Sequence, residues 1–297
     1  MIFNSNRLNN LIVFTPYFWL ILFFFIPLAL IFKISISVAE WGMPPYQDIF
    51  IFDNGLKINV TLENYFFIVK DSYYLNSFIN SIKLAFISTL LCIFIGYPIA
   101  YYIATSSFDL RNILLILIII PFWSSFLLRV YAWKIILQGN GIINNLLIYF
   151  NLIEQPLQLL YNQYAVLVGV VYTYLPLMIL PLYGFLVKLD LKLVDAAYDL
   201  GSKKFSTFFR IILPLSIPGI LAGSLLVFIP IVGEFIIPDM LGGSDKLYYG
   251  KILWEEFFVN RNWPSASALA FLGIFILVVP IVVFQILYAK WTNKNEI

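Results

Sequence analysis

Charged side chains are rare in the long apolar stretches of this sequence, so each one is a candidate functional group. A charged residue at the centre of a membrane helix costs ~2.5–3.5 kcal/mol on insertion scales, which makes it a functional hypothesis. Lys83, Arg129 and Glu234 are the cases here. Glu234 stands out because an aromatic residue, Phe235, follows it directly. A carboxylate beside an aromatic ring could hold an organic ammonium group through an ion pair and a cation–π contact once water is removed.

The residues around Glu234 predict a break in a helix. Gly233 loosens the helix before Glu234, and Pro238 is expected to break it a few residues later. Membrane transporters place solute sites at such broken helices. Asp239, further along the same segment, could meet a second ammonium group or serve as an entrance site. Three aromatic residues on neighbouring apolar stretches could complete the lining: Trp123, Tyr172 and Tyr174.

Each of these residues also has a purely structural interpretation. Glu234 could pair with Arg129 or another buried cation and hold the helices together. Arg129 is expected to pair with a carboxylate, because it would repel a cationic solute. Lys83 lies near the start of an apolar stretch, from which its long side chain can reach the polar interface. With 29 Phe and 19 Tyr in the chain, any one aromatic is more often a packing or lipid-facing residue.

A second polar constellation lies in segment 191–214, a charged island between two apolar stretches. An acidic residue, two alanines and a glycine are followed by an Ile-x-Leu-Pro motif. These residues are Asp195, Ala196, Ala197, Gly201, Ile211, Leu213 and Pro214. Alanines let a partner surface approach a short helix closely, and a glycine can take the left-handed conformation that ends it. We therefore expect a short helix here that contacts another protein.

The composition identifies the elements that must position these residues. The sequence is 62% hydrophobic and 11% charged, with a mean hydropathy of +0.91, whereas about 25% charged residues would be typical of a soluble domain. The chain is therefore an integral membrane protein. Its net charge of +2 comes from scattered basic residues and gives no reason to expect nucleic acid as a partner.

The apolar stretches predict an all-α membrane protein with about six transmembrane helices, because a span requires about 20 apolar residues. The candidate spans are 11–33, 77–104, 113–137, 164–187, 211–237 and 266–289. We find no linker or soluble segment, so we expect a single transmembrane permease-like domain over residues 1–297.

Lysine and arginine in the short loops predict the orientation, since these residues favour the cytoplasmic side. Loop 188–210 is rich in them, and loop 138–163 has none. The docking segment is therefore expected on the cytoplasmic side, together with both termini. The long loop at about 34–76 is then outside, and its acidic residues either favour a cationic solute or a basic docking face, or form an ordinary solvated surface.

Several chemistries are not supported by the sequence. The Gly250-Lys251 pair lacks the upstream glycine and the following Ser or Thr of a phosphate-binding loop. The chain contains no histidine, which excludes a Ser-His-Asp triad and the usual zinc sites. We therefore expect a non-catalytic protein without a metal or cofactor of its own. Any step driven by ATP hydrolysis would require ATP-Mg on a separate partner.

The docking segment resembles the loop by which permeases of ABC importers contact their ATPase, with Asp195 where the family usually has Glu. Longer segments are similar to polyamine importer permeases, first to that of the putrescine importer and next to the spermidine/putrescine permease. These segments are Pro121–Trp133, Gln155–Leu160, Val227–Gly243, Ile252–Phe258 and Asn260–Pro264. The docking motif is typical of the whole superfamily, whereas these segments narrow the resemblance to polyamines.

The resemblance implies a type I ABC-importer permease bundle with a cytoplasmic coupling helix in the bacterial cell (inner) membrane. It implies a second homologous permease subunit, two ATP-binding subunits and an extracytoplasmic solute-binding protein as partners. The solute would be a polyamine, with putrescine as the first candidate, moved by alternating access. The alternatives are a permease for another solute such as ferric iron, thiamine or sulfate, or a self-sufficient secondary transporter or channel.

Overall fold

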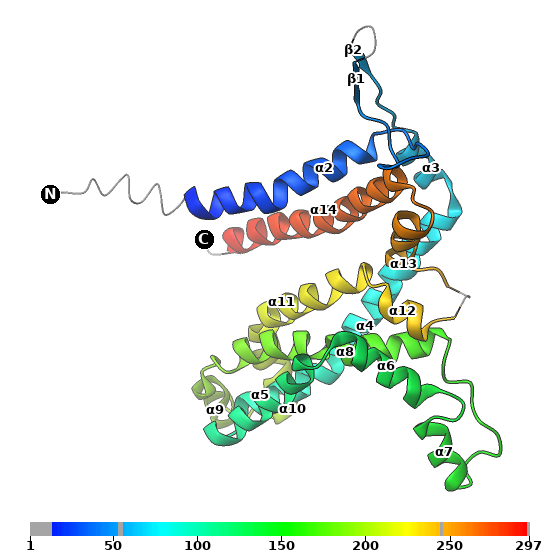
Figure 1. Ribbon diagram of the computed structural model, residues 1–297. Helices are drawn as coiled ribbons and strands as arrows, with labels where there is room; N and C mark the ends of the chain where they lie inside the picture. Colours follow the sequence, from blue (N-terminus) through cyan, green and yellow to red (C-terminus); the bar gives the residue numbers. More distant parts are fainter. Residues whose placement is uncertain (1–13, 53–55, 244–245, 296–297) are drawn as a thin grey trace, which may run out of the picture. The chain divides into compact units, whose positions relative to one another are not determined.

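The computed structural model describes residues 14–52, 56–243 and 246–295, which are mostly helical (Figure 1). The chain divides into two compact units. One is built from residues up to Leu75 and from Ile252 onward, and the other from Asn76–Lys251. We describe the two units separately. That residues 1–297 work as one membrane domain remains a prediction.

In the first unit, two long helices lie side by side (Figure 1). The N-terminal helix contains a π-helical turn, η1 (Ile21–Phe25), and continues as α2 (Ile26–Ser35). It packs along α14 (Trp263–Asn295), where the rings of Phe32 and Phe271 are 5.0 Å apart. Apolar side chains of the N-terminal helix and of α14 thus form an interface within the first unit.

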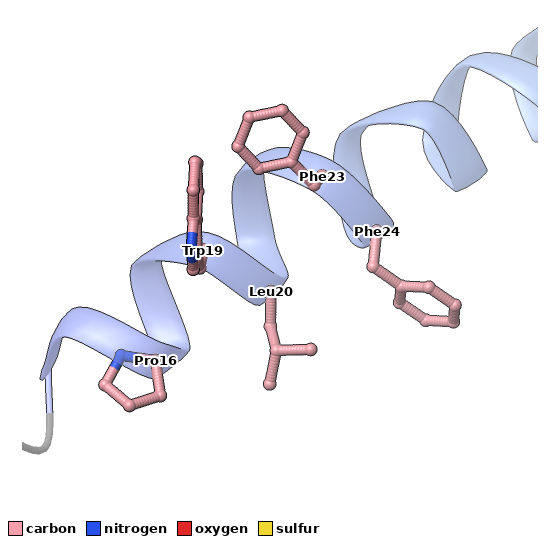
Figure 2. A pocket seen from close by; sticks show the side chains of 5 residues that line it. All are labelled: Pro16, Trp19, Leu20, Phe23 and Phe24. Carbon is pink, nitrogen blue, oxygen red and sulfur yellow. The ribbon is translucent and has the colours of Figure 1, made fainter.

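The first turns of the N-terminal helix expose a groove of ~460 Å³ that is lined almost entirely by apolar atoms. Figure 2 shows its side chains, all from this one helix: Pro16, Trp19, Leu20, Phe23 and Phe24. Such a surface suits contact with lipid chains or another apolar helix. It offers no carboxylate for a cation, so it is not a candidate solute site.

The segment expected as a long loop, 34–76, is more ordered than the sequence suggested. Strand β1 (Phe50–Phe52) pairs antiparallel with β2 (Leu56–Ile58), and α3 (Glu63–Lys70) follows. The side chain of Tyr65 on α3 is 2.6 Å from Ser35 Oγ at the end of α2, and burial raises the pKa of Tyr65. The mostly helical prediction is confirmed, with this small hairpin as an addition that the apolar pattern did not predict.

In the second unit, α8 (Gln163–Leu186) and α11 (Leu213–Val232) pack closely along each other (Figure 1). Two glycines of α11 make this approach possible. A Cβ atom added at Gly219 would lie 2.9 Å from Phe185 Cβ, and one added at Gly223 would lie 2.7 Å from Met178 Sδ. Small residues at such contacts let membrane helices pack backbone against backbone. Helix α4 (Ser72–Thr105) joins them, with Tyr97 Oη and Ser216 Oγ 2.9 Å apart.

Four helices of the described chain are long and apolar enough to cross a membrane: Phe14–Ser35, Ser72–Thr105, Gln163–Leu186 and Lys204–Val232. Residues 11–13 of the first predicted span lie outside the described residues. Residues Trp263–Val279 of α14 form a shorter apolar helix and are not counted among these four. The bent pair described next raises the number of candidate spans to five if it is counted as one.

The predicted span 113–137 is divided by a break, and its two parts pass as one candidate span only together. Helix α5 (Phe108–Trp123) ends at Ser124, and α6 (Phe126–Leu137) starts after Ser125, with a 90° bend between them. Ser124 Oγ donates to the carbonyl of Pro121, 2.7 Å away, and both serines have extended backbone. The side-chain bond offers the backbone an alternative to the next helical turn, which is how serine ends helices.

Candidate functional site

The break around Glu234 is present, but its cause differs from the prediction. Helix α11 ends at Val232 and α12 (Ile236–Leu241) begins three residues after Gly233. Pro238 does not break the helix. It lies buried in the first turn of α12, where the missing N–H of a proline costs no helical hydrogen bond.

The start of a third helix, α13 (Tyr249–Trp254), packs against this break. This helix places Gly250 so close to the break that a Cβ atom there would overlap the carbonyl oxygen of Gly233. Ser81 Oγ accepts a hydrogen bond of 2.9 Å from the backbone N–H of Tyr249, and burial raises the pKa of the Tyr249 hydroxyl. The break is therefore a packed junction between α11, α12 and α13.

The carboxylate of Glu234 accepts three hydrogen bonds, all from neutral donors. Glu234 is 8% exposed, and its Oε2 accepts a bond of 2.5 Å from the hydroxyl of Tyr174 on α8. Its Oε1 accepts from the backbone N–H groups of Ile236 and Ile237, at 2.9 and 3.3 Å. These are free N–H groups of the first turn of α12, so the carboxylate caps that helix, where a negative charge is favoured.

Glu234 and Arg129 do not form the structural ion pair that was one of the two interpretations. The ion pairs of the described residues are Lys33–Asp48 and Lys251–Asp239, each 3.1 Å long. The guanidinium of Arg129 instead lies over two aromatic rings, with its Cζ 5.0 Å from the centre of Phe122 and 5.8 Å from that of Phe126. Glu234 is thus held by hydrogen bonds from neutral groups.

Asp239 already has a cation beside it. Its carboxylate lies 3.1 Å from Lys251 Nζ, and both side chains are partly exposed. The sequence did not identify Lys251 as a member of this site, because the two residues lie on separate short helices whose packing no local pattern reveals. A second ammonium group at Asp239 would have to share the carboxylate with this lysine or replace it.

Of the three predicted lining aromatics, the structure brings only Tyr174 to Glu234. Tyr172 packs edge-on against Trp133 at 5.5 Å and borders a cavity of ~290 Å³ beside Arg129. Trp123, at the end of α5, is 84% exposed. Phe235 follows Glu234 in the break itself and is half-buried, while Lys83 is exposed on α4.

The docking segment forms the expected short helix, α9 (Leu191–Asp199). Asp190 caps it by accepting from the backbone N–H of Lys192 at 3.0 Å. Gly201 has a φ of +82°, and the N–H of Ser202 bonds to the carbonyl of Ala197 at 2.9 Å, which closes the helix. The left-handed glycine predicted from the sequence is therefore confirmed.

The surface of this segment is mixed. Asp195 and Ala196 are exposed, whereas Ala197 is buried against its own chain. Sequence reasoning missed two strongly exposed apolar side chains next to them, Leu200 and Phe205. Both follow the charged helix at positions that a search for apolar periodicity ignores. The part of Asp195, Ala196, Ala197 and Gly201 in docking remains a prediction.

A second buried carboxylate was missed. Glu256, in the π-helical turn η3 (Glu255–Val259) of the first unit, is 8% exposed. Its Oε1 accepts a bond of 3.0 Å from the hydroxyl of Tyr74 near the start of α4. The adjacent Glu255 made the pair look like an ordinary polar stretch in the sequence.

Comparisons with known proteins identify the family of the chain. Residues 93–291 match the family described as "Binding-protein-dependent transport system inner membrane component". The chain is 37% identical over 291 residues to the "Spermidine/putrescine transport system permease protein PotB" of Haemophilus influenzae, covering 98% of this chain and 97% of that protein. The Escherichia coli protein of the same name is 38% identical over 250 residues, or 84% of this chain and 86% of that protein.

A solved structure shares the fold. A bacterial ABC transporter involved in the import of the acidic polysaccharide alginate has a chain that superposes with a TM-score of 0.70, over 98% of this chain and 96% of that one. The sequence identity of 14% makes this a likeness of fold alone. Taken with the family match and the relatives, it shows that this chain belongs to the binding-protein-dependent inner membrane components, the permease subunits of ABC importers, and is not an enzyme.

Proposed function

We propose that this permease moves a polyamine across the membrane, with putrescine as the first candidate, and that Glu234 holds an ammonium group of the solute during passage. The observation that carries the proposal is the bonding of Glu234. Its buried carboxylate accepts from a tyrosine hydroxyl and two backbone N–H groups and faces no cation within ion-pair distance among the described residues.

Such a carboxylate is prepared for a cation. Its hydrogen bonds fix the orientation of the oxygens without neutralising their charge, and an arriving ammonium group would supply the missing countercharge. Phe235 directly follows, so a cation–π contact can add to the ion pair. The two relatives named for spermidine and putrescine support a polycationic solute. A sulfate ion would be repelled by the same carboxylate.

The partners follow from the same proposal. Helix α9 would contact an ATP-binding subunit on the cytoplasmic side, with both chain termini on that side. Two such subunits, a second permease and an extracytoplasmic solute-binding protein would complete the importer. ATP binding would move α9 with its ATPase and rock the spans between inward and outward access. A cysteine at Ser202, in a Cys92→Ala background, should then react with an impermeant thiol reagent only from the cytoplasm.

Glu234→Gln tests the solute role. The amide keeps an oxygen that can cap α12 but removes the charge, so uptake of labelled polyamine by the assembled importer should fall. The loss of a desolvated ion pair costs ~2–5 kcal/mol, which corresponds to tens-fold or more in rate or apparent affinity. The melting temperature and ATPase binding should change little.

Glu256→Gln is the matched control, because it removes a second buried carboxylate that also accepts from a tyrosine. It should leave uptake per folded complex near that of the unmodified importer. Full uptake by Glu234→Gln would refute the proposed role. A drop in its melting temperature as large as the drop in uptake would instead show that Glu234 is structural.

A further inference from the structure

Arg129 forms no ion pair with another described residue and lies in the same unit as Glu234. Its Nε is buried and lacks a hydrogen-bond partner, and its guanidinium is held over the rings of Phe122 and Phe126. A buried N–H without an acceptor costs about 1–3 kcal/mol, and more in a charged group. A residue kept in this state in an apolar helix calls for an acceptor that it reaches in another conformation.

The helix of Arg129 packs against the elements that form the Glu234 site. Helix α6 contacts both α8, which carries Tyr174, and α12, which Glu234 caps. The hydroxyl of Tyr174 donates to Glu234 Oε2 at 2.5 Å, and the charge of Arg129 also acts on this hydroxyl. Tyr174 therefore bonds to Glu234 from the helix against which α6 packs.

The surroundings leave Arg129 room to move. It borders the ~290 Å³ cavity that Ser124 and Tyr172 also line. Its two aromatic platforms lie on opposite sides of the 90° bend, Phe122 on α5 and Phe126 on α6. A change in that bend would separate the platforms and release the guanidinium.

We propose that Arg129 is a built-in competitor for Glu234, which displaces the solute's ammonium group when the path changes its access. The inference rests on the proposed role of Glu234. In the conformation described here, the Tyr174 hydroxyl donates to Oε2 in place of Arg129, and the remaining lone pair of Oε2 is open to the solute's ammonium group. When Tyr174 gives way, the guanidinium can form a bidentate pair with Glu234, and one carboxylate cannot neutralise both cations. Arg129 is in this sense a release residue.

The test uses the assembled importer with its ATPase and solute-binding protein. Tyr174→Phe removes the hydroxyl, frees Oε2 for Arg129, and should lower polyamine uptake about tenfold, the effect of ~1.4 kcal/mol. Tyr183→Phe is the matched control on the same helix, since its hydroxyl makes no hydrogen bond among the described residues. It should leave uptake unchanged.

Variants of Arg129 provide the decisive test. Arg129→Gln alone should lower the maximal rate about two- to threefold, because release loses its competitor, while Arg129→Lys keeps the charge and more of the rate. Combined with Tyr174→Phe, Arg129→Gln should restore uptake to the level of Arg129→Gln alone, a non-additivity that a merely structural tyrosine would not produce.

The outcomes separate this inference from the proposed function. If Glu234→Gln keeps full uptake, the proposed function falls and the inference with it. If Glu234→Gln loses uptake but the double variant is no better than Tyr174→Phe, only the inference is overturned. Normal uptake by Tyr174→Phe, or complete loss of uptake in Arg129→Gln, overturns it as well.

Discussion

Two glutamates are buried among the described residues, one in each compact unit, and they differ in what surrounds them. Both are 8% exposed and both accept from a tyrosine hydroxyl, Tyr174 for Glu234 and Tyr74 for Glu256. Glu234 lies at a helix break and also caps α12, whereas Glu256 lies inside the turn η3 and links it to the start of α4. Burial of a carboxylate therefore does not by itself identify a solute path.

The positions of the two tyrosine–glutamate bonds in the fold suggest different roles for Glu256 and Glu234. Tyr74 and Glu256 are 182 residues apart, so their bond closes the first unit between its N-terminal and C-terminal parts. Glu234 is bonded within a junction of three helix ends, and α12 of this junction packs against α6, whose Arg129 has no ion-pair partner in the described chain. The comparison predicts that disturbing Glu256 lowers stability, whereas disturbing Glu234 lowers transport.

The largest effect is expected at Gly250, which allows α13 to approach the Glu234 junction. Gly250→Val would drive a side chain into the Gly233 carbonyl, and also toward the Glu234 carbonyl, 2.8 Å from the added Cβ. Such overpacking typically costs ~1–3 kcal/mol and occasionally more, so the melting temperature and uptake should both fall strongly. Gly184→Ala is the control, because no atom lies within 4 Å of its added Cβ. An unchanged Gly250→Val would mean that α13 does not pack on the junction.

Sequence reasoning reached those features that short segments determine. The α9 helix and its left-handed Gly201 follow from residues within one segment, and both were predicted. The break at Glu234 was predicted as well, but its cause was not. Pro238 was expected to break the helix, whereas the break lies at the end of α11 and is packed against Gly250.

The remaining features depend on contacts between distant segments. The bond of Tyr174 to Glu234 spans 60 residues, and that of Tyr74 to Glu256 spans 182. No periodicity in a chain with 29 Phe and 19 Tyr shows which tyrosine meets which carboxylate. The 90° bend after α5 was missed for a related reason, because an apolar stretch of sufficient length predicts a span whether or not two serines interrupt it.

The second effect tests the duty of Glu256. Tyr74→Phe leaves a buried carboxylate without the 3.0 Å donor, which should cost ~1–3 kcal/mol of unfolding free energy. Uptake per correctly folded complex should remain near normal. Thermal unfolding in detergent, followed alongside uptake by the reconstituted importer, gives both quantities. Lost uptake at unchanged stability would place Glu256 in the solute path and remove the distinction between the two glutamates.

The third effect concerns coupling, which should depend on neither glutamate. Gly201→Val places a β-branched side chain at a φ of +82°, which strains the end of α9 by ~1–3 kcal/mol. Copurification of the ATPase and ATP-driven uptake should fall, while the membrane-inserted amount stays normal. Gly139→Ala serves as control, since its added Cβ meets no atom within 4 Å. Normal ATPase copurification with full uptake would remove the docking assignment.

The smallest effect is expected from Lys251, and it sharpens the account of the Glu234 site. Lys251 Nζ lies 3.1 Å from Asp239, where a second ammonium group would bind if Asp239 takes part in transport. Because both side chains are partly exposed, Lys251→Met should change the unfolding free energy by less than ~1 kcal/mol. It should also lower the polyamine concentration that half-saturates ATPase stimulation by about two- to threefold, since the solute no longer displaces a resident cation. Lys33→Met is the matched control, because it breaks the other exposed 3.1 Å pair, with Asp48 in the first unit. If the two variants behave alike, Asp239 only anchors α12 to α13, and Glu234 is left as the single carboxylate of the proposed path.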